Sequence, residues 1–206
     1  MKVAIANNKG GVGKSTIAMN VADCLGQDSN VILLDADDDG TSLDHFKDGK
    51  IQSYVCQEVF LNTLLDEDFL QTLDTDFDHV IIDCPPYKSE LATGCMYLAD
   101  FILIPVEASG GSLRKLPNLL EKVQACIKTN NSKAAFMVSR KPNSTLGNIM
   151  PELLNQFDLP VFNASTSHLT AYNDSLTLGT TVLAYRPRSK AADEIRAITK
   201  EILSYV

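Results

Sequence analysis

A glycine-rich turn, Lys9-Gly10-Gly11-Val12-Gly13-Lys14-Ser15-Thr16, stands between a short apolar run and a helical pattern that begins at Lys14. In a strand–loop–helix unit of this kind, glycines let successive backbone N–H groups turn inward, and the helix adds the positive end of its dipole. The turn therefore predicts a site for phosphate groups. Lys14 is the expected charge for the β- and γ-phosphates, and the Ser15 hydroxyl is an expected ligand of Mg²⁺.

Short β-rich apolar runs alternate with longer helical patterns along the chain. This alternation predicts an α/β fold with a doubly wound, mostly parallel sheet and helices on both faces. The expected strands are residues 2–6, 30–35, 79–83, 101–106, 134–140 and 161–163. The expected helices are residues 14–25, 89–99, 113–129, 146–157, 167–178 and one from 189 to the end. Residues 41–78, rich in aspartate, are expected to form short helices and a strand around 52–55, with the aspartates on a solvated face.

Length and composition fit one α/β domain over residues 1–206. The net charge of −8 argues against a surface that binds nucleic acid everywhere, although it allows a local basic patch. No apolar run reaches the roughly 20 residues of a membrane-spanning helix, so we expect a cytoplasmic protein. The five cysteines include no CxxC pair and are interpreted mainly as reduced core residues.

Aspartates close two of the expected strands. Asp35 and Asp37 end the run that starts at residue 31, and Asp83 ends the run 79–83. Each alone is also typical of a helix cap or a turn. Because the carboxyl ends of parallel strands meet at the ligand crevice, their arrival together with the glycine turn favours a site. Asp83 is interpreted as a Walker B carboxylate that holds the metal next to Ser15.

The lysine ahead of the double glycine gives the pattern KGGxGK[ST], with Asn8 in place of the glycine of the ordinary Walker motif. Together with residues 33–40, 80–86, 102–106 and the tail from Ala171 to Ala192, this pattern resembles the deviant Walker ATPases of the ParA/MinD family. The chain looks most like the short ParF-like members, which lack an N-terminal helix-turn-helix domain. The resemblance covers essentially the full length.

The resemblance implies that ATP, ADP and Mg²⁺ are the ligands and that ATP closes a face-to-face homodimer. It implies weak ATP hydrolysis that a ParB-like or other small adaptor stimulates. By resemblance, Lys9 reaches the phosphates of the other subunit, Asp37 orients or activates the attacking water, and Asp35 supports Mg²⁺ through its hydration shell. Arg140 and Lys141 are assigned to the adenine pocket, with a DNA contact as the competing role.

The resemblance also implies that the ATP dimer binds DNA without sequence preference and positions a plasmid, a chromosome region or another cargo on the nucleoid. The candidate contacts to DNA phosphates are Arg186, Arg188 and Lys190, and solvated surface charges are the alternative interpretation. Two other functions stay open: a metabolic or metal-cofactor ATPase, and a MinD-like membrane regulator. A membrane regulator is disfavoured because no basic amphipathic segment follows the last expected helix.

Two short segments depart from the family pattern. Asp38 and Asp39 replace the proline and glutamine that often follow the second carboxylate, which leaves the shape and charge of that segment open. His168, Leu169 and Thr170 stand where relatives usually carry an arginine, so a DNA or partner contact is expected to differ there.

Overall fold

The computed structural model describes residues 1–37, 42, 44, 47, 51–86 and 89–205. Its centre is a six-stranded sheet with the strand order β3-β2-β4-β1-β5-β6, in which every pairing is parallel. The strands are β1 (Lys2–Ile5), β2 (Val31–Asp35), β3 (Val55–Glu58), β4 (His79–Asp83), β5 (Phe101–Glu107) and β6 (Lys133–Ser139). The predicted doubly wound α/β fold is therefore confirmed.

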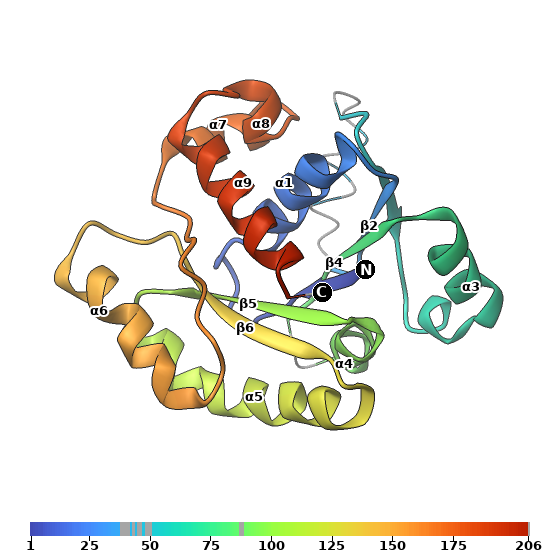
Figure 1. Cartoon of the computed structure of the whole chain (residues 1–206), viewed down its shortest axis with the longest axis horizontal. Coiled ribbons are helices and arrows are strands. Elements are labelled where there is room, and N and C mark those ends of the chain that lie inside the picture. The colour runs from blue at the N-terminus through green and yellow to red at the C-terminus, as the bar shows by residue number, and fades with distance from the viewer. Residues whose placement is uncertain (38–41, 43, 45–46, 48–50, 87–88, 206) are drawn as a thin grey trace.

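Each strand sends alternate side chains to opposite faces of the sheet, and both faces are buried. In β1, Val3 and Ile5 join one hydrophobic cluster, whereas Ala4 joins the other. The first cluster lies under α1 (Lys14–Gly26), α7 (Thr170–Thr177), α8 (Val182–Tyr185) and α9 (Lys190–Leu203). The second lies under α4 (Glu90–Leu98), α5 (Gly110–Asn130) and α6 (Thr145–Leu154). Figure 1 shows these two layers above and below the sheet.

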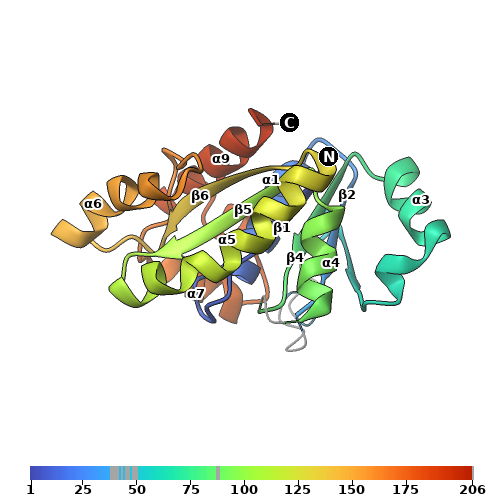
Figure 2. The ribbon, with the colours of Figure 1, turned by 90° about the horizontal axis from the view of Figure 1, so that it is seen from below.

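The helix α3 (Glu67–Asp76) lies at the β2 side of the sheet, beyond α4 (Figure 2). The 3₁₀ turns η1 (Thr63–Leu65) and η2 (Asn155–Phe157) precede α3 and follow α6. Asp66 caps α3 by accepting from the N–H groups of Asp68 and Phe69. Short helices and a strand are thus present in residues 51–78, as predicted, and the described part of the chain contains no helix long and apolar enough to cross a membrane.

The prediction of a strand at residues 161–163 is wrong. Val161 forms only an isolated bridge to Phe136. The next backbone N–H groups, of Asn163 and Ala164, donate instead to the carboxylate of Glu201 in α9, each at 2.9 Å. A carboxylate on the covering helix therefore ends the pairing, which no local pattern indicated.

The starts of three other elements differ from the prediction by three residues. The strand expected around 52–55 begins at Val55, because the Ser53 hydroxyl donates to Asp23 of α1 before the chain enters the sheet. The helix expected from 113 begins at Gly110, with the Ser109 hydroxyl accepting from Ser112 N–H as its cap. The helix expected from 167 begins at Thr170, since the preceding residues run beside the end of β6.

All five cysteines are free thiols, and Cys84, Cys95 and Cys126 are buried in the core. This agrees with their interpretation as reduced residues.

Candidate functional site

A cavity of about 380 Å³ opens at the carboxyl end of the sheet. One side is the glycine loop, residues 9–16, which connects β1 to α1. The other side is the segment of residues 166–173, here called the wall segment, which includes the first turn of α7. The lining residues are Gly10, Gly11, Gly13, Lys14, Ser15, Thr16, Ile17, Asp37, Pro86, Arg140, Thr166, Ser167, His168, Leu169, Thr170, Tyr172 and Asn173. The cavity is thus built from both ends of the sequence.

The glycine loop has the backbone geometry that an anion site needs. Gly11 and Gly13 have φ values of 75° and 92°, a left-handed conformation that favours glycine. Gly13 is the N-cap of α1 and has no side chain that would bond the first N–H groups of the helix. These N–H groups and the positive end of the helix dipole therefore remain available to a phosphate in the cavity. Val12 is fully buried, so its side chain anchors the loop to the core.

Lys14 and two aspartates form a buried charged group beneath the loop. The side chain of Lys14 belongs to a residue only 6% exposed, and Asp35 and Asp83 are fully buried. Asp35 and Asp83 are register partners at the ends of the neighbouring strands β2 and β4. The Ser42 hydroxyl donates to Asp83 Oδ2 at 2.8 Å. The predicted meeting of the strand-end carboxylates at one edge therefore occurs.

Burial above all, together with the neighbouring Asp35 charge, raises the pKa of Asp83 to about 7, although Ser15, Ser42 and Lys14 act in the opposite direction. Asp83 Oδ1 is buried and has no hydrogen-bond partner among the residues that the structure describes. A buried carboxylate oxygen without a partner is costly unless a cation completes it. Two carboxylates beside a serine hydroxyl are oxygen donors of the kind that Mg²⁺ prefers, so the donor set fits this metal.

Asp37 lies two residues beyond β2 and lines the cavity. Its N–H donates to Asp35 Oδ1 at 3.1 Å, which ties the residue that faces the cavity to the buried carboxylate. Asp38 and Asp39, whose effect was left open, lie outside the described residues.

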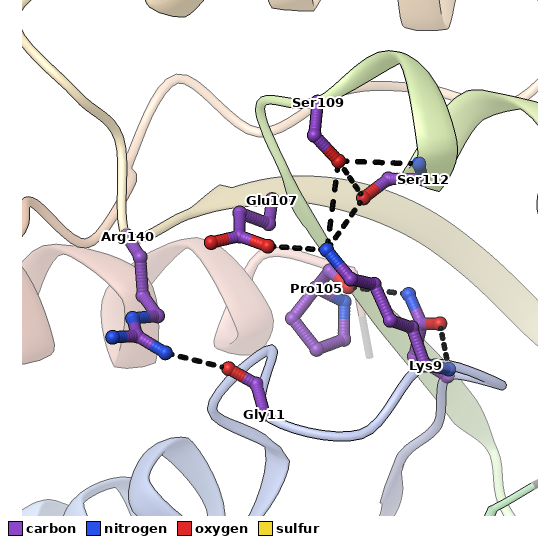
Figure 3. A network of polar contacts seen from close by, with 8 residues as sticks. Lys9, Gly11, Pro105, Glu107, Ser109, Ser112 and Arg140 are labelled. Atoms are coloured by element: carbon purple, nitrogen blue, oxygen red, sulfur yellow. Dashed lines mark hydrogen bonds and ion pairs between the residues drawn. The ribbon is translucent and has the colours of Figure 1, made fainter.

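Lys9 does not follow Lys14 into the cavity. Its ammonium contacts Glu107 at the end of β5, and it lies 3.5 and 3.4 Å from the hydroxyls of Ser109 and Ser112 (Figure 3). The loop before it is tied to β5 as well, because the Asn7 side chain donates to the Pro105 carbonyl at 2.6 Å and accepts from Lys9 N–H. The two lysines of the glycine loop therefore occupy different surroundings.

Arg140 and Lys141, which were predicted together for the adenine pocket, separate in the structure. Arg140 lines the cavity, and its guanidinium donates to the Gly11 carbonyl at 2.8 Å (Figure 3). Arg140 has a φ of 48°, an uncommon value for a residue with a side chain. Lys141 is not among the described residues that line the cavity. Lys141 instead forms a backbone bridge with Ser167.

His168, Leu169 and Thr170 line the cavity. The departure from the family pattern at these positions therefore lies at the cavity, and the expected difference in a DNA or partner contact stays a prediction.

Sequence reasoning missed the partners of Lys9. Glu107, like the predicted aspartates, follows a buried strand at the ligand edge, and that position was an available signal. Ser109 and Ser112 carry only the signal of a helix cap.

The basic cluster Arg186, Arg188 and Lys190 lies outside the cavity lining, around the start of α9. The Arg186 guanidinium stacks over the Tyr185 ring with 4.9 Å to the ring centroid, and Lys190 Nζ lies 3.7 Å from Glu194 Oε1. All three basic residues are exposed, so they remain candidates for a phosphate-binding surface.

A family model described as an AAA domain matches residues 1–57 and 50–136 of the chain. The chain is 32% identical over 208 residues to the maintenance of carboxysome distribution protein A of Halothiobacillus neapolitanus, covering 98% of this chain and 95% of that protein. It is 23% identical to the sporulation initiation inhibitor protein Soj of Bacillus subtilis, with 97% of each covered.

Among solved structures, the septum site-determining protein MinD complexed with Mg-ADP from Pyrococcus horikoshii has the same fold, with a TM-score of 0.76 at 18% identity and coverage of 98% of this chain and 95% of that one. The relatives span nearly the whole chain, and the family match extends from β1 into β6. The chain belongs to this AAA domain family and, within it, to the ParA/MinD group of P-loop ATPases.

Proposed function

We propose that this protein binds ATP with Mg²⁺, closes a homodimer around it, hydrolyses it slowly, and uses that cycle to position a cargo on nucleoid DNA. The positioning role is supported by the names of the relatives, one a carboxysome distribution protein and one a Soj protein. The nucleotide role is supported by the cavity, its free helix N-terminus and its buried lysine.

The observation that carries this proposal is that the two lysines of the glycine loop lie in different places. Lys14 is buried at the cavity, where it serves phosphates bound by its own subunit. The Lys9 side chain is 28% exposed and is bound to Glu107, outside the lining of its own cavity. A second subunit facing this edge of the sheet would receive Lys9, which then neutralises transition-state charge as an arginine finger does.

Each of the remaining cavity residues has a defined task in this reaction. The N–H groups of the glycine loop and Lys14 hold the β- and γ-phosphates, and Asp37 orients the attacking water. Ser15, Asp83 and Asp35 would hold Mg²⁺, with Asp35 acting through the hydration shell. When bound, Mg²⁺ neutralises negative charge on the phosphates. Hydrolysis is slow in the isolated monomer because the positive charge of Lys9 is absent from its own site.

Size-exclusion chromatography with light scattering, together with phosphate release, tests the nucleotide part. The wild type should dimerise only with ATP and Mg²⁺. Lys14→Ala should bind no nucleotide, whereas Lys9→Ala should bind ATP as a monomer and hydrolyse it poorly. Full turnover by Lys9→Ala, or an ATP-bound wild type that stays monomeric, would exclude the cross-subunit role.

Binding to nonspecific DNA tests the positioning part. The ATP-bound protein should bind DNA with an affinity that falls as salt rises, and Arg188→Ala should reduce the slope of log K against log salt by about 1. Lys128→Ala, an exposed charge at the end of α5, is the matched control and should leave the slope unchanged. ATP-dependent binding to anionic liposomes without binding to DNA would favour a membrane regulator instead.

A further inference from the structure

The first half of the wall segment, residues 166–169, is not helical, whereas its second half, residues 170–173, is the first turn of α7; both halves contribute to the cavity lining. Residues 166–169 run in an extended course before α7 begins at Thr170, and they carry Ser167, His168 and Leu169 into the lining. A stretch of this kind lacks the continuous backbone hydrogen bonds of a helix or a strand, so contacts with other elements must fix its conformation.

One side of the wall segment is held by the end of β6. Lys141 N–H donates to the Thr166 carbonyl at 2.7 Å, and Arg140 N–H donates to the Thr166 hydroxyl at 2.9 Å. The Arg140 side chain continues to the Gly11 carbonyl at 2.8 Å. These bonds connect the wall segment to the glycine loop through β6.

The other side is held by a single carboxylate, that of Glu194 in α9. Glu194 accepts from Ser167 N–H at 2.9 Å, from the Ser167 hydroxyl at 2.5 Å and from the Tyr172 hydroxyl at 2.9 Å. Its side chain is only 10% exposed, and Tyr172 is buried. Hydrogen bonds to a charged, largely buried acceptor are stronger than neutral ones. Burial raises the pKa of Tyr172 above its usual range, as does the Glu194 charge, so the hydroxyl remains a donor.

We propose that Glu194 is a positioning residue for the nucleotide: it touches no ligand, but it holds Ser167 and Tyr172 in the shape that receives the nucleoside end of ATP. The inference rests on the proposed nucleotide binding and assigns Glu194 a role within it. The ion pair between Glu194 and Lys190 does not account for the burial of this carboxylate. The Lys190 side chain is 69% exposed and its Nζ approaches Glu194 only to 3.7 Å, so the pair is weak.

The chain supplies a matched control on the same helix. Glu201 accepts from the N–H groups of Asn163 and Ala164, at 2.9 Å each, much as Glu194 accepts from Ser167. Asn163 and Ala164 lie outside the cavity lining. Replacing either glutamate removes hydrogen bonds between α9 and the connection from α6 to α7. Only the bonds of Glu194 involve residues that line the cavity.

Isothermal titration calorimetry with a non-hydrolysable ATP analogue and Mg²⁺ measures the effect. Glu194→Ala should raise the Kd about tenfold, the loss expected from one or two charge-assisted hydrogen bonds that order the wall. Glu194→Gln should restore the affinity, because its amide oxygen can accept from Ser167 N–H and Tyr172. Glu201→Ala should leave the Kd unchanged. The kcat at saturating ATP should stay within about twofold in all three variants, since the phosphate side is untouched.

Equal affinity of wild type and Glu194→Ala would overturn the inference alone, as would an equal loss in Glu201→Ala. Failure of the wild type to bind the analogue would overturn the proposed nucleotide binding, and this inference with it. If Glu194→Ala does not fold, Tyr172→Phe removes one of the three hydrogen bonds and keeps the ring. An unchanged Kd in Tyr172→Phe together with a weak-binding Glu194→Gln would then count against the positioning role.

Discussion

Glu107→Gln should strengthen ATP-dependent dimerisation, because Lys9 must leave Glu107 before its ammonium can reach the phosphates of a partner subunit. The Lys9 and Glu107 side chains are 28% and 33% exposed, so solvent screens their ion pair. A pair of this exposure contributes about 0.5 kcal/mol, and a dimer breaks two, which gives about 1 kcal/mol or roughly fivefold in the dimer dissociation constant. The hydroxyls of Ser109 and Ser112 remain in place and still solvate Lys9 in the monomer.

Sedimentation velocity at several protein concentrations, with ATP and Mg²⁺, measures this dissociation constant. Asp74→Asn is the control: it makes the same one-unit charge change and removes the ion pair between Asp74 and Lys2, which begins β1 at the opposite end of that strand from the glycine loop. The control should dimerise as the wild type does. A dimer weakened by Glu107→Gln would show that Glu107 supports Lys9 in the dimer, and would refute the competition argued here.

Three further changes test the cavity. Asp37→Ala should keep ATP bound and accumulate the dimer, because it removes water positioning and leaves the phosphate cradle intact; an ATP-bound monomer in chromatography would contradict this. Arg140→Ala should weaken binding of the ATP analogue severalfold by releasing the Gly11 carbonyl, an effect on the order of 1 kcal/mol in calorimetry. The raised pKa of Asp83, about 7 against an ordinary value of 3.8, means that the folded state retains a proton which the unfolded state has lost between about pH 4 and 7. The stability of the nucleotide-free protein in chelator should therefore fall across that window as pH rises, and Asp83→Asn should remove this part of the slope in denaturant titrations; an identical slope in both proteins would contradict it.

The sequence was sufficient for those parts of the fold that repeat a local rule. Apolar runs ending in aspartate predicted β2 and β4, and their parallel arrangement alone brings Asp35 and Asp83 together as register partners. The glycine loop predicted its own anion-binding geometry, because Gly11 and Gly13 adopt positive φ values that few other residues tolerate.

Contacts between distant parts of the chain could not be predicted in the same way. Lys9 and Glu107 are 98 residues apart, and Glu194 is 27 residues from Ser167. Neither pair has a spacing that a helix or strand period would reveal. The failed strand at 161–163 has the same origin, because the carboxylate that ends it, Glu201, lies 38 residues away from Asn163 on a covering helix. Tertiary acceptors of this kind override local β propensity.

The cost of burying the charges at this site also has a functional consequence. Asp35 and Asp83 are fully buried neighbours, and Asp83 Oδ1 has no partner among the described residues, so two ionised carboxylates at this place are electrostatically unfavourable. A ligand that brings positive charge to these oxygens therefore relieves this unfavourable electrostatic energy. Because it binds the folded protein and not the unfolded chain, it also raises the free energy of unfolding. The same ligand would connect β2 and β4 to the glycine loop through Ser15, at the edge of the sheet that faces the second subunit in the proposed dimer. The electrostatic cost of these buried carboxylates is thus a physical reason to expect that the proposed binding of ATP and Mg²⁺ changes the stability of this edge of the sheet.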